Sequence, residues 1–158
     1  MTNKKPDIIE LINNRKVYHD YTLQDKYDAG IALKGWEVKA IRQHRINLQD
    51  SHINIRNQEC WLIGAHITPL PTTTPYTHPD PTRNRKLLLT RREINKLIGA
   101  IQQKGLTIVP CRLFLKTNLI KLKIALAKGK KQYDKRQAEK EKTWQREKQQ
   151  MLKNQTRQ

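Results

Sequence analysis

The sequence predicts a mainly β fold with flanking helices (α+β), followed by a basic C-terminal tail. Short β-prone segments recur between residues 17 and 128, residues 90–104 have a clear helical pattern, and the residues after 127 are rich in charge and poor in apolar side chains. The length of 158 residues suits one domain with an extension. We therefore expect a flexible N-terminus at 1–15, a folded domain at 16–127 and a tail at 128–158.

The first part of the domain is expected to alternate between strand and helix. Residues 17–22 are β-prone and predict a strand. A helix is expected next, because Thr22 and Asp25 resemble a helix start and apolar residues follow at fourfold spacing: Leu23, Tyr27 and Ile31. Gly35 can end that helix, and residues 36–42 predict a second strand.

The middle of the domain contains a predicted hairpin and a predicted loop. Ile53 and Ile55 alternate with polar residues, and Asn57-Gln58 resembles a tight turn into a strand at 60–65. Residues 69–81 are rich in proline and threonine and have no periodicity, which predicts a long loop. The helix at 90–104 follows, with a Thr90–Glu93 capping box, an end at Gly105 and an apolar stripe of Ile94, Leu97, Ile98 and Ile101.

The last two strands are expected at 106–116 and 119–128, joined by a turn at Thr117-Asn118. In the second strand, Lys121 and Lys123 project from the face opposite to the apolar residues Ile120, Leu122, Ile124 and Leu126. About six short strands in mostly hairpin order predict a small antiparallel barrel of the OB type, an architecture that often binds nucleic acids. An open sheet with packed helices is the alternative.

The charge balance predicts a polyanionic partner. The chain has 32 Lys and Arg against 14 Asp and Glu, a net charge of +18. RNA, DNA and an anionic membrane surface all satisfy this charge, but no apolar run approaches the roughly 18 residues that span a bilayer. The N-terminus lacks an apolar signal core, and Cys60 and Cys111 suit reduced, strand-buried thiols, so we expect a cytoplasmic protein.

Catalytic patterns are missing from the sequence. The glycines form neither a GxGxxG motif nor a P-loop, the five histidines have no metal-ligand spacing, and the carboxylates are scattered. We therefore expect a binding protein that is not an enzyme and needs no cofactor and no metal. An RNA-processing enzyme and a general structured-RNA-binding or ribosome-associated protein are the rival interpretations.

Two basic clusters suit contact with RNA. The first, Arg83, Arg85 and Lys86, lies in a loop and could follow a phosphate backbone or be merely solvated. The second cluster, at 128–136, directly follows the last predicted strand. Its aromatic residue, Tyr133, suits stacking on an unpaired base or capping the end of the barrel.

Three segments resemble the transfer-messenger RNA (tmRNA)-binding protein family, also called SsrA-binding or SmpB proteins. They are Gly-Trp-Glu-Val-Lys at 35–39, Asp-Pro-Thr-Arg-Asn-Arg-Lys-Leu-Leu-Leu at 80–89 and Ala-Lys-Gly-Lys-Lys-Gln-Tyr-Asp-Lys-Arg at 127–136. They occur in the family's order and spacing, and the likeness runs from about Lys16 to the C-terminus. The resemblance implies an OB-type barrel that binds the tRNA-like domain of tmRNA and rescues stalled ribosomes by trans-translation. It also implies elongation factor Tu with GTP as a partner, through alanyl-tmRNA, and we expect the protein to be a monomer.

The resemblance also implies the site residues. Positions that match His19, Asp28, Leu88 and Lys121 lie on or beside the family's RNA surface, and the basic residues complete the expected tmRNA site: Arg83, Arg85, Lys86 and Lys123. Asp28 replaces the family's more usual glutamate.

The tail is implied to enter the ribosomal decoding centre and the empty mRNA channel. The expected tail residues are Lys128, Gly129, Lys130, Lys131, Tyr133, Asp134, Lys135, Arg136, Trp144 and Met151. Tyr133 replaces the histidine that is commonest in the family, which preserves stacking but removes protonation near neutral pH. Because the tail has too few apolar residues to offset its chain entropy, we expect it to be disordered when free and helical on the ribosome.

Overall fold

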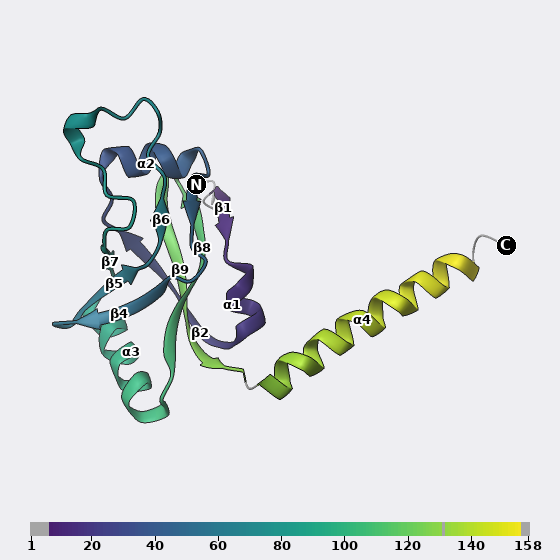
Figure 1. Cartoon of the computed structure of the whole chain (residues 1–158). Helices are drawn as coiled ribbons and strands as arrows, with labels where there is room; N and C mark the ends of the chain where they lie inside the picture. The colour runs from purple at the N-terminus through teal and green to yellow at the C-terminus, as the bar shows by residue number, and fades with distance from the viewer. Residues whose placement is uncertain (1–6, 131, 156–158) are drawn as a thin grey trace, which may run out of the picture.

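The computed structural model describes residues 7–130 and 132–155 and is built on a seven-stranded antiparallel sheet (Figure 1). The strand order is β1-β8-β9-β2-β7-β5-β4, and β3 (Ile46–Asn47) pairs separately with β6 (His66–Ile67). The seven strands are β1 (Ile8–Asn13), β2 (Tyr21–Ile31), β4 (His52–Arg56), β5 (Glu59–Ile63), β7 (Arg85–Leu88), β8 (Thr107–Lys116) and β9 (Leu119–Gly129). The expected antiparallel fold with flanking helices is confirmed, but no ladder between the edge strands β1 and β4 closes the described strands into a barrel.

Two of the four described helices cover the core of the sheet, and the last one leaves it. The helices are α1 (Arg15–Asp20), α2 (Gly35–Arg42), α3 (Arg91–Lys104) and α4 (Gln132–Gln155), with a short 3-10 turn, η1, at Pro75–Thr77. In Figure 1, α2 and α3 lie near opposite ends of the sheet, and α4 extends away from it. Apolar side chains of α2 and α3 share one buried cluster with the strands: Trp36, Ala40, Ile41, Ile94 and Leu97.

Three elements near the N-terminus differ from the sequence prediction. Residues 15–20 are helix α1, not strand, and the segment expected to be a helix from Thr22 is strand β2. A bulge between Leu23 and Lys26 inserts an extra residue into β2 opposite β9, so apolar residues recur at a spacing that imitates a helix. The segment at 36–42 is helix α2, not strand, because its buried residues follow helical spacing: Trp36, Glu37, Ala40 and Ile41.

The sheet also begins before the expected domain boundary at residue 16. Ile8–Asn13 form β1, which pairs with β8 and buries Leu11, within the segment expected to be a flexible N-terminus. Residues 1–6 of that segment lie outside the described part of the chain.

The other predicted elements are confirmed. The two-residue turns at Asn57-Gln58 and Thr117-Asn118 have positive φ angles, 49° and 61° in the first and 48° and 66° in the second. In α3, the Thr90 hydroxyl oxygen accepts a hydrogen bond from the Glu93 backbone N–H, and Gly105 ends the helix with a φ of 63°. Both cysteines are free and buried on strands, as expected.

A buried cluster of charges joins α2 to the segment that leads into β7. Glu37 and Arg85 are both fully buried, and the Arg85 Nε donates to the Glu37 carboxylate. Arg83 donates to the same carboxylate through its Nε, at 3.1 Å, and through a terminal nitrogen. The Lys34 backbone N–H adds a hydrogen bond of 2.7 Å. Burial alone would raise the pKa of Glu37, but the hydrogen bonds from Arg83, Lys34 and Arg85 hold the pKa below its ordinary value.

Each nitrogen of the Arg85 guanidinium has a hydrogen-bond acceptor within the protein. Its remaining nitrogens donate to the carbonyl oxygens of Ala65, at 3.0 Å, and Pro81, at 3.1 Å. The guanidinium therefore fixes the ends of the 65–81 segment as well as α2, and Arg85 begins β7 in a defined position.

We predict that Glu37→Gln lowers the free energy of unfolding by about 3–5 kcal/mol, because it leaves a buried guanidinium without its counter-charge. Urea unfolding at neutral pH measures this loss. Since the carboxylate's pKa is depressed in the fold, its contribution is present above the ordinary pKa and is lost as the pH falls through the folded-state value, so wild type and variant should converge in acid.

Glu59→Gln is the matched control. Glu59 pairs with Lys86 at 3.0 Å in an exposed ion pair, whose loss should cost about 0–1 kcal/mol. Equal losses in the two variants would show that the Glu37 cluster does not anchor the fold.

Candidate nucleic-acid interface

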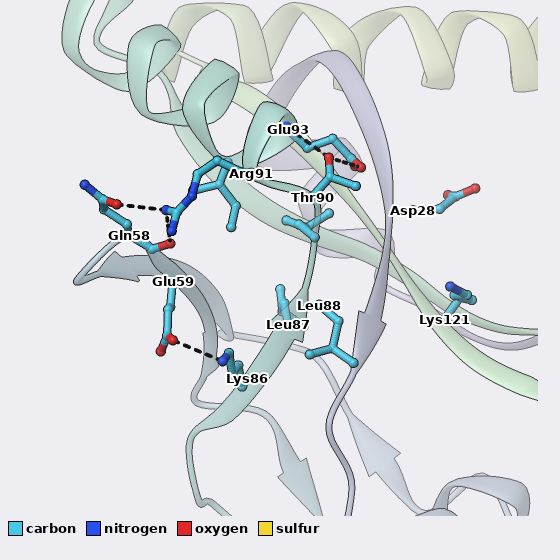
Figure 2. A pocket seen from close by; sticks show the side chains of 12 residues that line it. Asp28, Gln58, Glu59, Lys86, Leu87, Leu88, Thr90, Arg91, Glu93 and Lys121 are labelled. Atoms are coloured by element: carbon cyan, nitrogen blue, oxygen red, sulfur yellow. Dashed lines mark hydrogen bonds and ion pairs between the residues drawn. The ribbon is translucent and has the colours of Figure 1, made fainter.

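A hollow of about 620 Å³ brings four of the expected site residues together (Figure 2). Its walls come from β2, the β4–β5 turn, β7, the start of α3 and β9, and the four residues are Asp28, Lys86, Leu88 and Lys121. Leu88 is 54% exposed, so its apolar side chain is accessible from the hollow. Gly30 pairs with Leu88 across β2 and β7, and a Cβ at Gly30 would lie 3.1 Å from the Leu88 Cβ, so glycine permits this close approach.

The basic residues around the hollow differ in how their charges are compensated. Lys86 forms an ion pair with Glu59 at 3.0 Å, and Lys123 forms one with Asp28 at 3.5 Å. Lys123 also lies over the Phe114 ring, with its amine 6.0 Å from the ring centroid. Lys121 has no ion pair with any described residue, so its positive charge is available to a ligand.

Arg83 and Arg85 lie apart from the lining of the hollow. Arg85 has no exposed surface, so the expectation that it contacts RNA is corrected: its guanidinium is consumed by Glu37 and backbone carbonyls. The Arg83 side chain is 23% exposed but binds Glu37 and donates to the Ala32 carbonyl oxygen at 3.2 Å. A cationic loop sequence cannot reveal that a carboxylate from another element neutralises it.

His19 lies where the tail leaves the core. It belongs to α1, and its Nδ1 lies 3.0 Å from Asp20, while its Nε2 lies 3.0 Å from Glu139 of α4. Hydrogen bonds to the carboxylates of Asp20 and Glu139 raise the pKa of the imidazole above its ordinary value. The Lys130 backbone N–H donates to the Asp20 carbonyl oxygen at 2.9 Å nearby. His19 therefore belongs to the exit of the tail, and the hollow's lining does not include it.

The tail residues follow β9 and form α4. Lys128 and Gly129 are exposed at the end of β9, and Lys130 follows them. Lys131 and the side chains of Tyr133, Asp134 and Lys135 lie outside the described part of the structure. Arg136 is exposed on α4, as are Trp144, at 62%, and Met151, at 60%. That the tail is disordered in the free protein and helical on the ribosome stays a prediction.

Two polar residues of the hollow that sequence reasoning did not assign to the site are Arg91 and Gln58. Arg91, the first residue of α3, lines it and donates to the Gln58 side-chain oxygen at 2.9 Å. The turn at Asn57-Gln58 was predictable, but its position beside the start of α3 depends on tertiary structure.

Within the described residues, no group of three or more His, Cys, Asp or Glu side chains is arranged to hold a metal ion. None of the described helices is long and apolar enough to cross a membrane.

Comparisons with known proteins agree on one family. The family model described as SmpB protein matches residues 11–154. The SsrA-binding protein of Bordetella parapertussis is 52% identical over 149 residues, covering 94% of this chain and 96% of that protein. The SsrA-binding protein of Thiobacillus denitrificans is 51% identical over 144 residues, covering 91% and 97%. That of Coxiella burnetii is 50% identical over 151 residues, covering 96% and 95%.

A solved structure has the same fold. It is described as "tmRNA-SmpB: a journey to the center of the bacterial ribosome", and its matching chain is 38% identical to this one. The match has a TM-score of 0.63 and covers 77% of this chain and 85% of that chain. Because the family model spans most of the sequence and the relatives are about half identical over nearly all of it, this chain belongs to the SmpB protein family.

Proposed function

We propose that this chain binds the tRNA-like domain of tmRNA and, together with it, rescues stalled ribosomes by trans-translation. The observation that carries the proposal is the likeness, at 52% identity over 94% of the chain, to proteins named for binding SsrA, the tmRNA. The solved tmRNA–SmpB chain, which shares the fold at 38% identity, points to the same activity on the ribosome.

The surface chemistry supports recognition without a covalent step. The net charge of +18 attracts RNA over long range, and the hollow presents an exposed apolar side chain, Leu88, beside the unpaired cation of Lys121. An RNA strand can place a base or sugar on Leu88 and a phosphate near Lys121. In this proposal the protein is not an enzyme, and it acts as a cytoplasmic monomer.

The tail has a separate role in the proposal. The core carries alanyl-tmRNA, with elongation factor Tu and GTP, to the ribosome, and the tail then probes the decoding centre and the empty mRNA channel. Exposed Trp144 and Met151 lie seven residues apart, so one helical face presents both of them to the channel. Tyr133 supplies an aromatic ring for stacking at the decoding centre.

A general affinity for structured RNA is the second candidate, and the net charge of +18 is the observation that favours it. Competition between tmRNA and an unrelated structured RNA of the same length separates the two functions. Selective binding of tmRNA supports the proposal, and equal competition supports the alternative.

We predict that Lys121→Gln flattens the salt dependence of tmRNA binding. One lost phosphate contact should reduce the slope of log K against log salt concentration by about 0.7–0.9. Filter binding across a salt series measures the slope. Lys96→Gln removes an equal charge from the exposed surface of α3, outside the hollow, and should leave the slope unchanged. An unchanged slope in Lys121→Gln would remove this residue from the interface.

A chain that stops after Lys131 should bind tmRNA with nearly full affinity but fail to tag peptides on stalled ribosomes. The truncation removes α4 and leaves every strand of the sheet in place. Filter binding and the tagging yield on a message without a stop codon measure the two properties. Normal tagging by the truncated chain would contradict the proposed role of the tail.

We predict that α4 exchanges with unfolded chain in the free protein. Its residues have good helix propensity, but an isolated helix of this length is marginal in water, and its apolar side chains Trp144 and Met151 are exposed. Ribosomal RNA phosphates would offset the repulsion among its cations and stabilise the helix. Hydrogen exchange should show fast amide exchange across α4 in the free protein and slow exchange on the ribosome. Slow exchange in the free protein would refute this coupling.

A further inference from the structure

We propose that Arg91 is a second phosphate-binding residue of the hollow, across from Lys121, and that Gln58 holds its guanidinium in position. This inference rests on the proposed RNA-binding function and assigns an additional contact within the same site.

The first line of support is the way Arg91 is held. It is the first residue of α3, and its Nη1 donates to the Gln58 side-chain oxygen at 2.9 Å and to the Gln58 carbonyl oxygen at 3.4 Å. Gln58 is in turn fixed by the tight β4–β5 turn, where its φ is 61°. Both acceptors are neutral, so they orient the guanidinium without cancelling its charge. An arginine fixed in this way retains other N–H donors for an anion.

The second line of support is that no carboxylate of the hollow engages Arg91 or Lys121. Asp28 pairs with Lys123 at 3.5 Å, Glu59 pairs with Lys86 at 3.0 Å, and Glu93 accepts a hydrogen bond of 2.8 Å from the neutral Thr90 hydroxyl. Arg91 and Lys121 are the lining cations that form no ion pair with a described residue. Both cations can therefore receive a phosphate without first breaking an ion pair.

The third line of support is the arrangement of these two cations. In Figure 2 they lie on opposite sides of Leu88, Arg91 at the start of α3 and Lys121 on β9, and the Arg91 guanidinium is turned toward Gln58. A nucleic-acid backbone has anionic phosphates on both sides of each sugar and base. A strand that rests a nucleotide on Leu88 would thus direct one phosphate toward Lys121 and another toward Arg91. A planar guanidinium also matches the oxygens of a phosphate through paired hydrogen bonds.

The test compares Arg91→Gln with Arg92→Gln. Both residues are exposed in the first turn of α3, so the two variants lose the same charge from the same helix end, but Arg92 does not line the hollow. With the tRNA-like domain of tmRNA as ligand, Arg91→Gln should reduce the log–log salt slope by about 0.7–0.9, and Arg92→Gln should leave it unchanged. Equal slopes in the two variants would overturn the assignment of Arg91. Urea unfolding of both variants checks that the fold is retained.

A double-mutant cycle tests the role of Gln58. Gln58→Ala should weaken binding in the wild-type background and have no further effect in Arg91→Gln, because its contribution passes through the guanidinium. A full additional loss in the double mutant would show that Gln58 acts on its own.

Lys121→Gln distinguishes a failure of this inference from a failure of the proposed function. If Lys121→Gln flattens the slope and Arg91→Gln does not, only the second contact is wrong. If neither variant changes the slope and the wild type binds tmRNA no better than other structured RNA, the proposed function fails as well.

Discussion

The carboxylate of Glu37 determines where β7 begins and therefore where the candidate interface lies. It accepts hydrogen bonds from Arg83 and Arg85, two cations in the segment that enters β7, and it is fully buried among them. From this fixed start, β7 pairs with β5 on one side and with β2 on the other. Leu88 reaches the hollow at the end of that short strand. A buried ion pair is a costly device for stability alone, and here it also fixes the position of a binding surface.

The cations in and beside the hollow consequently fall into three groups with different physical roles. Arg85 is buried and structural, Lys86 and Lys123 are compensated by neighbouring carboxylates, and Lys121 and Arg91 form no ion pair with a described residue. Net charge, to which all of them contribute, governs the long-range attraction of a polyanion. The uncompensated cations alone can form direct contacts without first breaking an ion pair. The number of basic residues in a motif therefore overestimates the number of RNA contacts.

The sequence predicted the second half of the sheet better than the first, for local reasons. The turns at Asn57-Gln58 and Thr117-Asn118 and the caps of α3 have signals within a few residues, and all were confirmed. In β2 a bulge disrupts the alternation by which a strand is recognised, and in α2 the buried glutamate concealed the helical face. The site shows the same limit: Leu88 and Lys121 were expected and share the hollow, whereas the burial of Arg85 depends on Glu37, distant in sequence.

The connection between the core and the tail is weaker than the buried contacts that position the candidate interface. A side-chain hydrogen bond from α4 to the core joins Glu139, whose side chain is 63% exposed, to His19, whose side chain is 37% exposed. Exposed ion pairs stabilise weakly and are screened by salt, so this contact cannot impose a direction on a helix as long as Gln132–Gln155. The fold thus fixes the hollow tightly and the tail loosely, as the proposed division between an RNA-binding core and a tail that probes the ribosome requires.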